Sequence, residues 1–164
     1  MYNSKMKKEV KRVYVDTSVV GVVADEESKQ LQTKPFWDAV RNGEIMIVVS
    51  GVLESELEGA PQHVRDFFDS IPESQIERVV STDESDTLAE RYIAEKVVGE
   101  SNLNDCKHVA LATICNADVL VSWNCKHIVN VERGKGYNSV NEKLGYPRIE
   151  IRTPYPYEVI HDET

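Results

Sequence analysis

The chain of 164 residues has little cysteine, few aromatic residues and no long apolar run. Cys106, Cys115 and Cys125 are odd in number and form no CxxC pair, so we expect no disulfide framework. Structural zinc sites usually space paired ligands more widely than the Cys-x-His triplets at 106–108 and 125–127, which argues against zinc. No segment approaches the roughly 20 apolar residues of a membrane span, and no apolar run follows the basic start as in a signal peptide. We therefore expect a cytoplasmic protein without a membrane segment.

Positive charge is also scarce, and the net charge of −9 argues against a protein that coats nucleic acid by bulk attraction. The distribution is uneven. Residues 1–12 hold five basic and one acidic residue, residues 13–121 hold eight and twenty-one, and residues 122–152 hold six and three. Two interpretations stay open: solvated faces of no special function, or basic segments that bind phosphate on either side of an acidic site.

Short apolar runs alternate with amphipathic segments along the chain, which is typical of α/β proteins. The expected strands are residues 13–15, 45–49, 76–80, 119–121 and 149–151. The expected helices are residues 36–40, 51–58, 62–70, 81–97 and 102–114. Strands that are apolar throughout are buried on both faces, so we predict a three-layer α/β/α sandwich around a mostly parallel sheet.

The length fits one domain over residues 1–164, with a core at about 11–152, a basic N-terminal extension and a short C-terminal extension. Residues 134–145 form the most loop-like stretch of the chain. The Gly-Lys-Gly at 134–136 follows no strand and precedes no GKS/T, so neither nucleotide-binding fingerprint applies.

Polar side chains stand where the expected strands end, and open α/β sheets form their sites at the carboxyl ends of strands. Asp16 ends the first strand, Ser50 the second and residues 122–124 the fourth. A carboxylate such as Asp16 is costly to bury unless it is paired, hydrogen-bonded or bound to metal, although a capping aspartate is the plain alternative. A phosphatase of the haloacid dehalogenase type would need a second aspartate where Ser18 stands.

Two further acids fall on helices near the same end of the sheet. Glu56 lies inside the apolar arc of the helix at 51–58, where a metal or catalytic role would explain it, as would pairing with a basic residue. Asp105 lies in the first turn of its helix, where free N–H groups stabilise an anion without any function. His108 follows three residues later and could touch substrate, but such a histidine, like His127, is more often a satisfied surface or core group.

Four segments together resemble the PIN-domain ribonucleases, whose bacterial members include the VapC-type toxins of toxin–antitoxin pairs. The matching segments, in the same order and separation, are residues 13–18, 50–57, 104–112 and 118–124. By position, Asp16, Glu56 and Asp105 look like the first three family acids, with Glu54 as the fallback for the second. Many family members carry a fourth aspartate where this chain has Asn124, so the site loses one negative charge.

The resemblance implies the same three-layer fold and metal-dependent cleavage of RNA. Asp16, Glu56 and Asp105 would bind Mg²⁺ or Mn²⁺, hard cations that take oxygen ligands, and the hydroxyls of Thr17 and Ser122 would assist at the substrate. With Asn124 in place of an acid, the site would hold a second metal weakly. Divalent metal should then stabilise the fold.

Three functions from different classes remain. The leading hypothesis is an endoribonuclease, a toxin whose antitoxin partner covers the site, with RNA held by the basic segments and stacked on Trp123 or Tyr137. The second is a non-catalytic PIN-like module that binds RNA or protein, which Asn124 supports. The third is a metal-dependent DNA nuclease or phosphatase. A homodimer is implied by the family alone.

Overall fold

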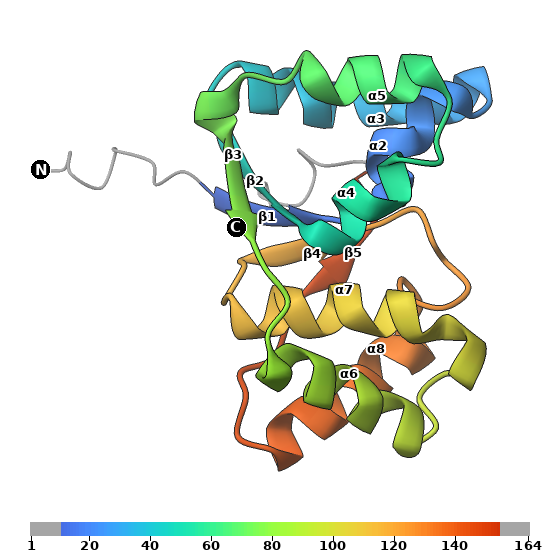
Figure 1. The fold of residues 1–164 in the computed structure, drawn as a ribbon, viewed down its shortest axis with the longest axis vertical. Helices are drawn as coiled ribbons and strands as arrows, with labels where there is room; N and C mark the ends of the chain where they lie inside the picture. The colour runs from blue at the N-terminus through green and yellow to red at the C-terminus, as the bar shows by residue number, and fades with distance from the viewer. Residues whose placement is uncertain (1–10, 155–164) are drawn as a thin grey trace, which may run out of the picture.

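The computed structural model describes residues 11–154, which form a five-stranded, all-parallel sheet between two helical layers (Figure 1). The three-layer α/β/α sandwich is therefore confirmed. The strands are β1 (Lys11–Val15), β2 (Ile45–Ser50), β3 (Ile76–Val79), β4 (Val119–Val121) and β5 (Ile151–Arg152). The expected extensions at residues 1–10 and 155–164 lie outside the described part of the chain.

The strand order is β3-β2-β1-β4-β5, so β1 lies at the centre with β2 on one side and β4 on the other. Val13 is the register partner of both Ile47 and Val119, and Val15 is that of Val121. The strand order reverses at β1, and in open parallel sheets ligands bind outside the carboxyl ends of the strands at such a switch point. The carboxyl ends of β1 and β4 therefore mark where a site is expected.

Helices cover both faces of the sheet (Figure 1). Along the chain they are α2 (Thr17–Val20), α3 (Glu27–Arg41), α4 (Gly51–Leu57), α5 (Gln62–Asp69), α6 (Asp83–Ala94), α7 (Leu103–Ile114) and α8 (Val131–Lys143), with 3₁₀ turns η1 (Gly21–Ala24), η2 (Glu73–Gln75) and η3 (Glu100–Asn102). Helices α2, α3 and α5 lie on one face, and α6, α7 and α8 on the other. Within residues 11–154, no helix has the length and apolar character that spanning a bilayer requires.

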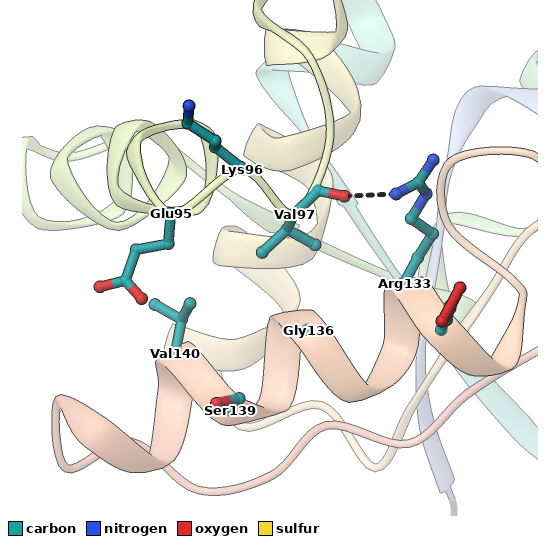
Figure 2. A pocket seen from close by; sticks show the side chains of 8 residues that line it. Glu95, Lys96, Val97, Arg133, Gly136, Ser139 and Val140 are labelled. Atoms are coloured by element: carbon teal, nitrogen blue, oxygen red, sulfur yellow. Dashed lines mark hydrogen bonds between the residues drawn. The ribbon is translucent and has the colours of Figure 1, made fainter.

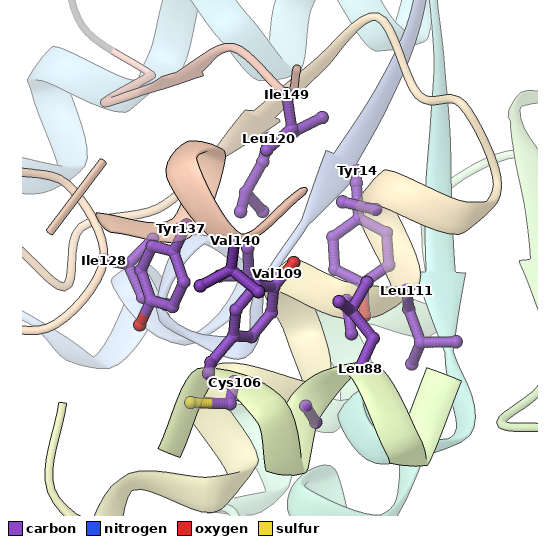
Figure 3. Packing of buried hydrophobic residues seen from close by; sticks show 14 of the residues in the cluster. Tyr14, Leu88, Cys106, Val109, Leu111, Leu120, Ile128, Tyr137, Val140 and Ile149 are labelled. Atoms are coloured by element: carbon purple, nitrogen blue, oxygen red, sulfur yellow. The ribbon is translucent and has the colours of Figure 1, made fainter. Parts of the chain in front are cut away.

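Successive side chains of β1 point to opposite layers, as the pleat of a strand demands. Val13 and Val15 belong to the apolar cluster under α3 and α5, whereas Tyr14 belongs to the cluster formed by α6, α7 and α8 (Figure 3). All three side chains are fully buried. The apolar run that predicted this strand is thus divided between two separate cores.

The prediction of a loop at residues 134–145 is wrong, because α8 covers Val131–Lys143. Asn130 caps the helix by accepting a hydrogen bond from the Arg133 N–H at 2.8 Å. Tyr137 and Val140 are buried in the core beside α6 and α7. Tertiary packing of this face outweighs the low helix propensity of the glycines.

The prediction that a helix begins at residue 36 is also wrong, because α3 begins at Glu27 and runs through Pro35. Proline favours the first turn of a helix because it lacks an N–H and clashes with the preceding turn. Pro35 is exposed, so water can solvate the backbone carbonyl that has lost its partner. The buried side chains Thr33, Phe36 and Trp37 hold the helix against the sheet on the other side.

One glycine of α8 allows a close approach to the loop after α6, beside a surface pocket (Figure 2). A Cβ atom built on Gly136 would lie 2.9 Å from Val97 Cγ1. Arg133 holds that loop by donating from Nη1 to the Val97 carbonyl at 2.8 Å. At Gly134, two residues earlier in the same helix, an added Cβ would meet no atom within 4 Å apart from the neighbouring backbone of its own helix.

Gly134→Ala and Gly136→Ala should therefore have opposite effects on stability. Gly134→Ala is expected to stabilise the protein by about 0.5–1 kcal/mol, because alanine loses less backbone entropy on helix formation. Gly136→Ala is expected to destabilise it by about 1–2 kcal/mol, because the stiff β-branched Val97 must move. Urea unfolding measures both. An equal gain for the two variants would contradict the close packing of α8.

Candidate active site

Asp16 stands at the carboxyl end of β1 and is only 4% exposed. Its Oδ1 accepts hydrogen bonds from the Ser18 N–H at 3.1 Å and the Ser18 hydroxyl at 2.6 Å. Its Oδ2 accepts from the Ser122 hydroxyl at 3.0 Å, and its own N–H donates to the Val121 carbonyl at 3.3 Å. Asp16 therefore both caps α2 and joins the ends of β1 and β4 at the switch point.

Burial raises the pKa of Asp16 even though Ser18, Ser122 and His108 all favour its ionised form. Desolvation penalises the charged carboxylate, and hydroxyl donors do not replace the lost water in full. A buried carboxylate whose charge is incompletely balanced is a place where a cation would stabilise the protein.

Asp105 reaches the same place from the first turn of α7. Burial is the main cause of its raised pKa, and the negative charge of Asp16 raises it further. Three groups oppose this shift: His127, whose Nδ1 lies 3.4 Å from Asp105 Oδ2, His108 and Asn124. Asp16 and Asp105 thus form a pair of mutually repelling carboxylates.

Glu56 lies on α4 with a side chain about one-third exposed. Its Oε1 accepts a short hydrogen bond from the Thr17 hydroxyl and lies 3.2 Å from His108 Nε2, while its Oε2 accepts from Asn104 Nδ2 at 3.2 Å. The contact with His108 is the main reason why the pKa of Glu56 is lowered. Glu56 therefore differs from the two aspartates in the direction in which its surroundings shift its pKa.

The fallback acid, Glu54, does not join this group, because its Oε2 accepts a hydrogen bond from Arg78 Nε at 3.0 Å on the surface. Asp118 lies at the opposite end of β4, as expected, and accepts from the Arg12 N–H at 2.8 Å. The helical arc that distinguished Glu56 from Glu54 thus agrees with the contacts that the two side chains make.

Asn124 shapes the turn that follows β4. Its Oδ1 accepts from the N–H groups of Lys126 at 3.2 Å and His127 at 3.0 Å, and its own N–H donates to Ser122 Oγ at 2.8 Å. Ser122 is fully buried and its hydroxyl donates a hydrogen bond to Asp16, so its side chain orients that carboxylate. Direct contact of Ser122 with a substrate stays a prediction.

Two pairs of predicted site residues are hydrogen-bonded at one edge of the sheet, Thr17 with Glu56 and Ser122 with Asp16, and Asn124 favours the ionised form of Asp105. Over residues 11–154, no three acidic, histidine or cysteine side chains lie close enough to hold a metal ion together. Mg²⁺ commonly takes only one or two carboxylates and keeps several waters. The chemistry of two carboxylates, Asp16 and Asp105, whose charges act on each other is of the kind that such an ion takes.

The sequence predictions missed the importance of His108, which is 2% exposed and contacts Glu56. The proposal that Tyr137 stacks on RNA bases is wrong, because Tyr137 is fully buried and donates its hydroxyl to the His127 carbonyl at 2.8 Å. Trp123 is partly buried, with its Nε1 donating to Thr33 Oγ1 at 2.9 Å and Lys29 Nζ lying 5.5 Å from its ring centroid.

No protein-family model and no curated protein matches this sequence. The structure is similar to a chain in the crystal structure of VapBC2 from Rickettsia felis bound to a DNA fragment from their promoter. The TM-score is 0.52 at 14% sequence identity, and the match covers 87% of this chain and 98% of that chain. At this identity the likeness concerns the fold, which the two chains share over most of their length.

Asp16→Asn is expected to raise the free energy of unfolding of the metal-free protein at pH 7, since it removes a buried charge and keeps the side-chain shape. A carboxyl whose pKa is raised by folding destabilises the folded state above that pKa. This destabilisation disappears as the pH falls below the ordinary value of 3.8, so the advantage of the variant should shrink between pH 7 and pH 4. Thermal unfolding in EDTA measures it, and a variant less stable than wild type at pH 7 would contradict the assignment.

Proposed function

We propose that this chain is an endoribonuclease of the PIN type that depends on Mg²⁺ or Mn²⁺. The observation that carries the proposal is the buried carboxylate of Asp16, held at the switch point of a parallel sheet beside Asp105. The four sequence segments that resemble PIN-domain ribonucleases and the fold shared with the VapBC2 chain support it. The substrate class, RNA, comes from the resemblance.

Each residue of the site would have a distinct part. Asp16 and Asp105 would hold the cation directly or through water, Glu56 would act on a water beside it, and Ser18 and Ser122 keep the oxygens of Asp16 in place. A bound Mg²⁺ or Mn²⁺ would neutralise charge on the scissile phosphate and lower the pKa of a bound water.

Glu56 suits the task of orienting the attacking water. Its lowered pKa keeps it ionised, so it accepts hydrogen bonds at neutral pH but is a weak base. Thr17 restrains Glu56 and would also meet the substrate at the partly exposed mouth of the site. Hydrolysis would then break the phosphorus–oxygen bond opposite the water that Glu56 orients.

The partners proposed for this chain are RNA and an antitoxin protein. The basic residue Lys126 lies in the turn after Asn124 and is exposed, so it would contact the RNA backbone near the acids. The likeness to the VapBC2 structure and the resemblance to VapC-type toxins support a protein partner. A homodimer stays an untested prediction.

Cleavage of a mixed pool of structured RNAs in Mn²⁺, Mg²⁺ or EDTA tests the proposal. Asp16→Asn and Asp105→Asn should each lower the rate by more than the roughly 10–100-fold expected from losing an outer-shell group. Asp118→Asn is the matched control, because it makes the same change at the opposite end of the sheet and should cleave like wild type.

Two results would contradict the ribonuclease proposal. One is wild-type cleavage that persists in EDTA, and the other is equal cleavage by wild type and Asp16→Asn. A parallel panel of single-stranded DNA, duplex DNA and a phosphomonoester distinguishes the ribonuclease from a DNA nuclease or a phosphatase.

A non-catalytic module that binds RNA or protein is the second candidate, and the neutral Asn124 favours it. Asn124→Asp puts a second negative charge near Asp105 in place of a neutral side chain that favours its ionised form, so it should destabilise the metal-free protein by about 1–3 kcal/mol. If wild type binds Mn²⁺ and RNA without turnover, and Asn124→Asp gains cleavage, the binding module is favoured. Thermal unfolding in EDTA and the RNA assay measure the two effects.

A further inference from the structure

A chain of polar contacts runs from the middle of the sheet to the candidate site. The Tyr14 hydroxyl donates to Ser50 Oγ at 2.8 Å and lies 2.8 Å from His108 Nδ1. The opposite ring nitrogen, His108 Nε2, lies 3.2 Å from Glu56 Oε1, which also accepts from Thr17. These contacts therefore connect strands β1 and β2 with helices α2, α4 and α7.

Tyr14 is an unusual residue for its position. It sits in the central strand, with its ring fully buried among the apolar side chains of α6, α7 and α8 (Figure 3). A buried hydroxyl is costly unless it is hydrogen-bonded, and phenylalanine would fill the same space without that cost. The Tyr14 hydroxyl contacts Ser50 and His108, so its role is to hold these two side chains in place.

Ser50 points to the same conclusion. It occupies the N-cap position of α4, where a serine side chain usually accepts a hydrogen bond from the first helical turn. Here the side chain makes no capping hydrogen bond. The Ser50 oxygen instead receives the Tyr14 hydroxyl inside the protein, where Ser50 is 1% exposed.

His108 is oriented at both ring nitrogens. Because an ionised carboxylate only accepts hydrogen bonds, the ring supplies the hydrogen between Nε2 and Glu56. The single hydrogen of the Tyr14 hydroxyl goes to Ser50, so the ring also supplies the hydrogen between Nδ1 and the Tyr14 oxygen. Tyr14 contacts Nδ1 and packs edge-on against the ring, with centroids 5.6 Å apart at 67°. The ring thus cannot turn away from Glu56 without leaving Nδ1 buried and unpaired.

We propose that Tyr14 and His108 are positioning residues that fix the Glu56 carboxylate at the mouth of the candidate site. They act from the layer of the protein formed by α6, α7 and α8. The proposal rests on the proposed function, since it assumes that Glu56 works with Asp16 and Asp105. Outer-shell partners of carboxylates at metal sites fix ligand orientation, and losing one typically lowers metal affinity or activity about 10–100-fold.

Tyr14→Phe is the decisive variant, and Tyr92→Phe is its matched control. Both tyrosines are fully buried in the same apolar cluster, and each change removes one bonded hydroxyl. The Tyr92 hydroxyl donates to Asn141 Oδ1 at 2.6 Å, away from Glu56. A merely structural role would give the two variants similar losses.

Mn²⁺ titration calorimetry on the RNA-free protein and RNA cleavage kinetics provide the readouts. Tyr14→Phe should weaken Mn²⁺ binding and lower kcat about tenfold with KM nearly unchanged, and Tyr92→Phe should leave all three within about twofold. His108→Leu should match or exceed Tyr14→Phe. His108→Gln, whose amide can still donate toward Glu56, should recover most of the loss.

A readout without metal keeps the two proposals apart. NMR of the metal-free protein should show an imidazole N–H proton protected from exchange, present in wild type, absent in His108→Gln and weakened in Tyr14→Phe. One outcome is that this proton is protected but wild type binds no Mn²⁺. The proposed function then fails and the positioning role is overturned, although the hydrogen bonds between Tyr14, His108 and Glu56 exist. If wild type binds Mn²⁺ and Tyr14→Phe equals Tyr92→Phe, the positioning role alone is overturned.

Discussion

Burying the carboxylate of Asp16 is the constraint on which the site depends. The central strand delivers this side chain to the point where the strand order reverses, almost out of reach of water. Ser18 and Ser122 supply hydroxyl donors, yet the pKa of Asp16 remains raised. The arrangement buries a charge at a cost in stability, and the proposed cation would offset that cost, so the same interaction would connect stability, pH and function.

The two faces of the sheet contribute differently to this arrangement. The layer of α2, α3 and α5 supplies an apolar cluster beneath Val13 and Val15. The layer of α6, α7 and α8 is apolar as well, but Tyr14 and His108 run through it as a polar connection to Glu56. Side chains of β1 therefore pack an apolar core on one face and position the site on the other. This is possible because β1 is the central strand and is covered by helices on both sides.

Much of this architecture could be predicted from local pattern. Short apolar runs predicted the strands. The position of Glu56 within the apolar arc of its helix predicted that its side chain faces the core. The errors came where tertiary contacts override local preference. Glycine did not prevent α8, since the absence of a side chain at Gly136 allows Val97 to approach. Pro35 did not interrupt α3, and Ser50 occupies a cap position without capping.

The amino-acid sequence by itself determined the kinds of element, the parallel sheet and the presence of acids where strands end or helices begin. Those properties follow from periodicity and from the cost of burying charge, both of which are local. Only the tertiary structure decided that the charge of Asp16 acts on Asp105, that Ser122 is committed to Asp16, and that His108 reaches Glu56. These contacts join residues up to 106 positions apart, and no local pattern encodes a distance between segments that meet only when the sheet assembles.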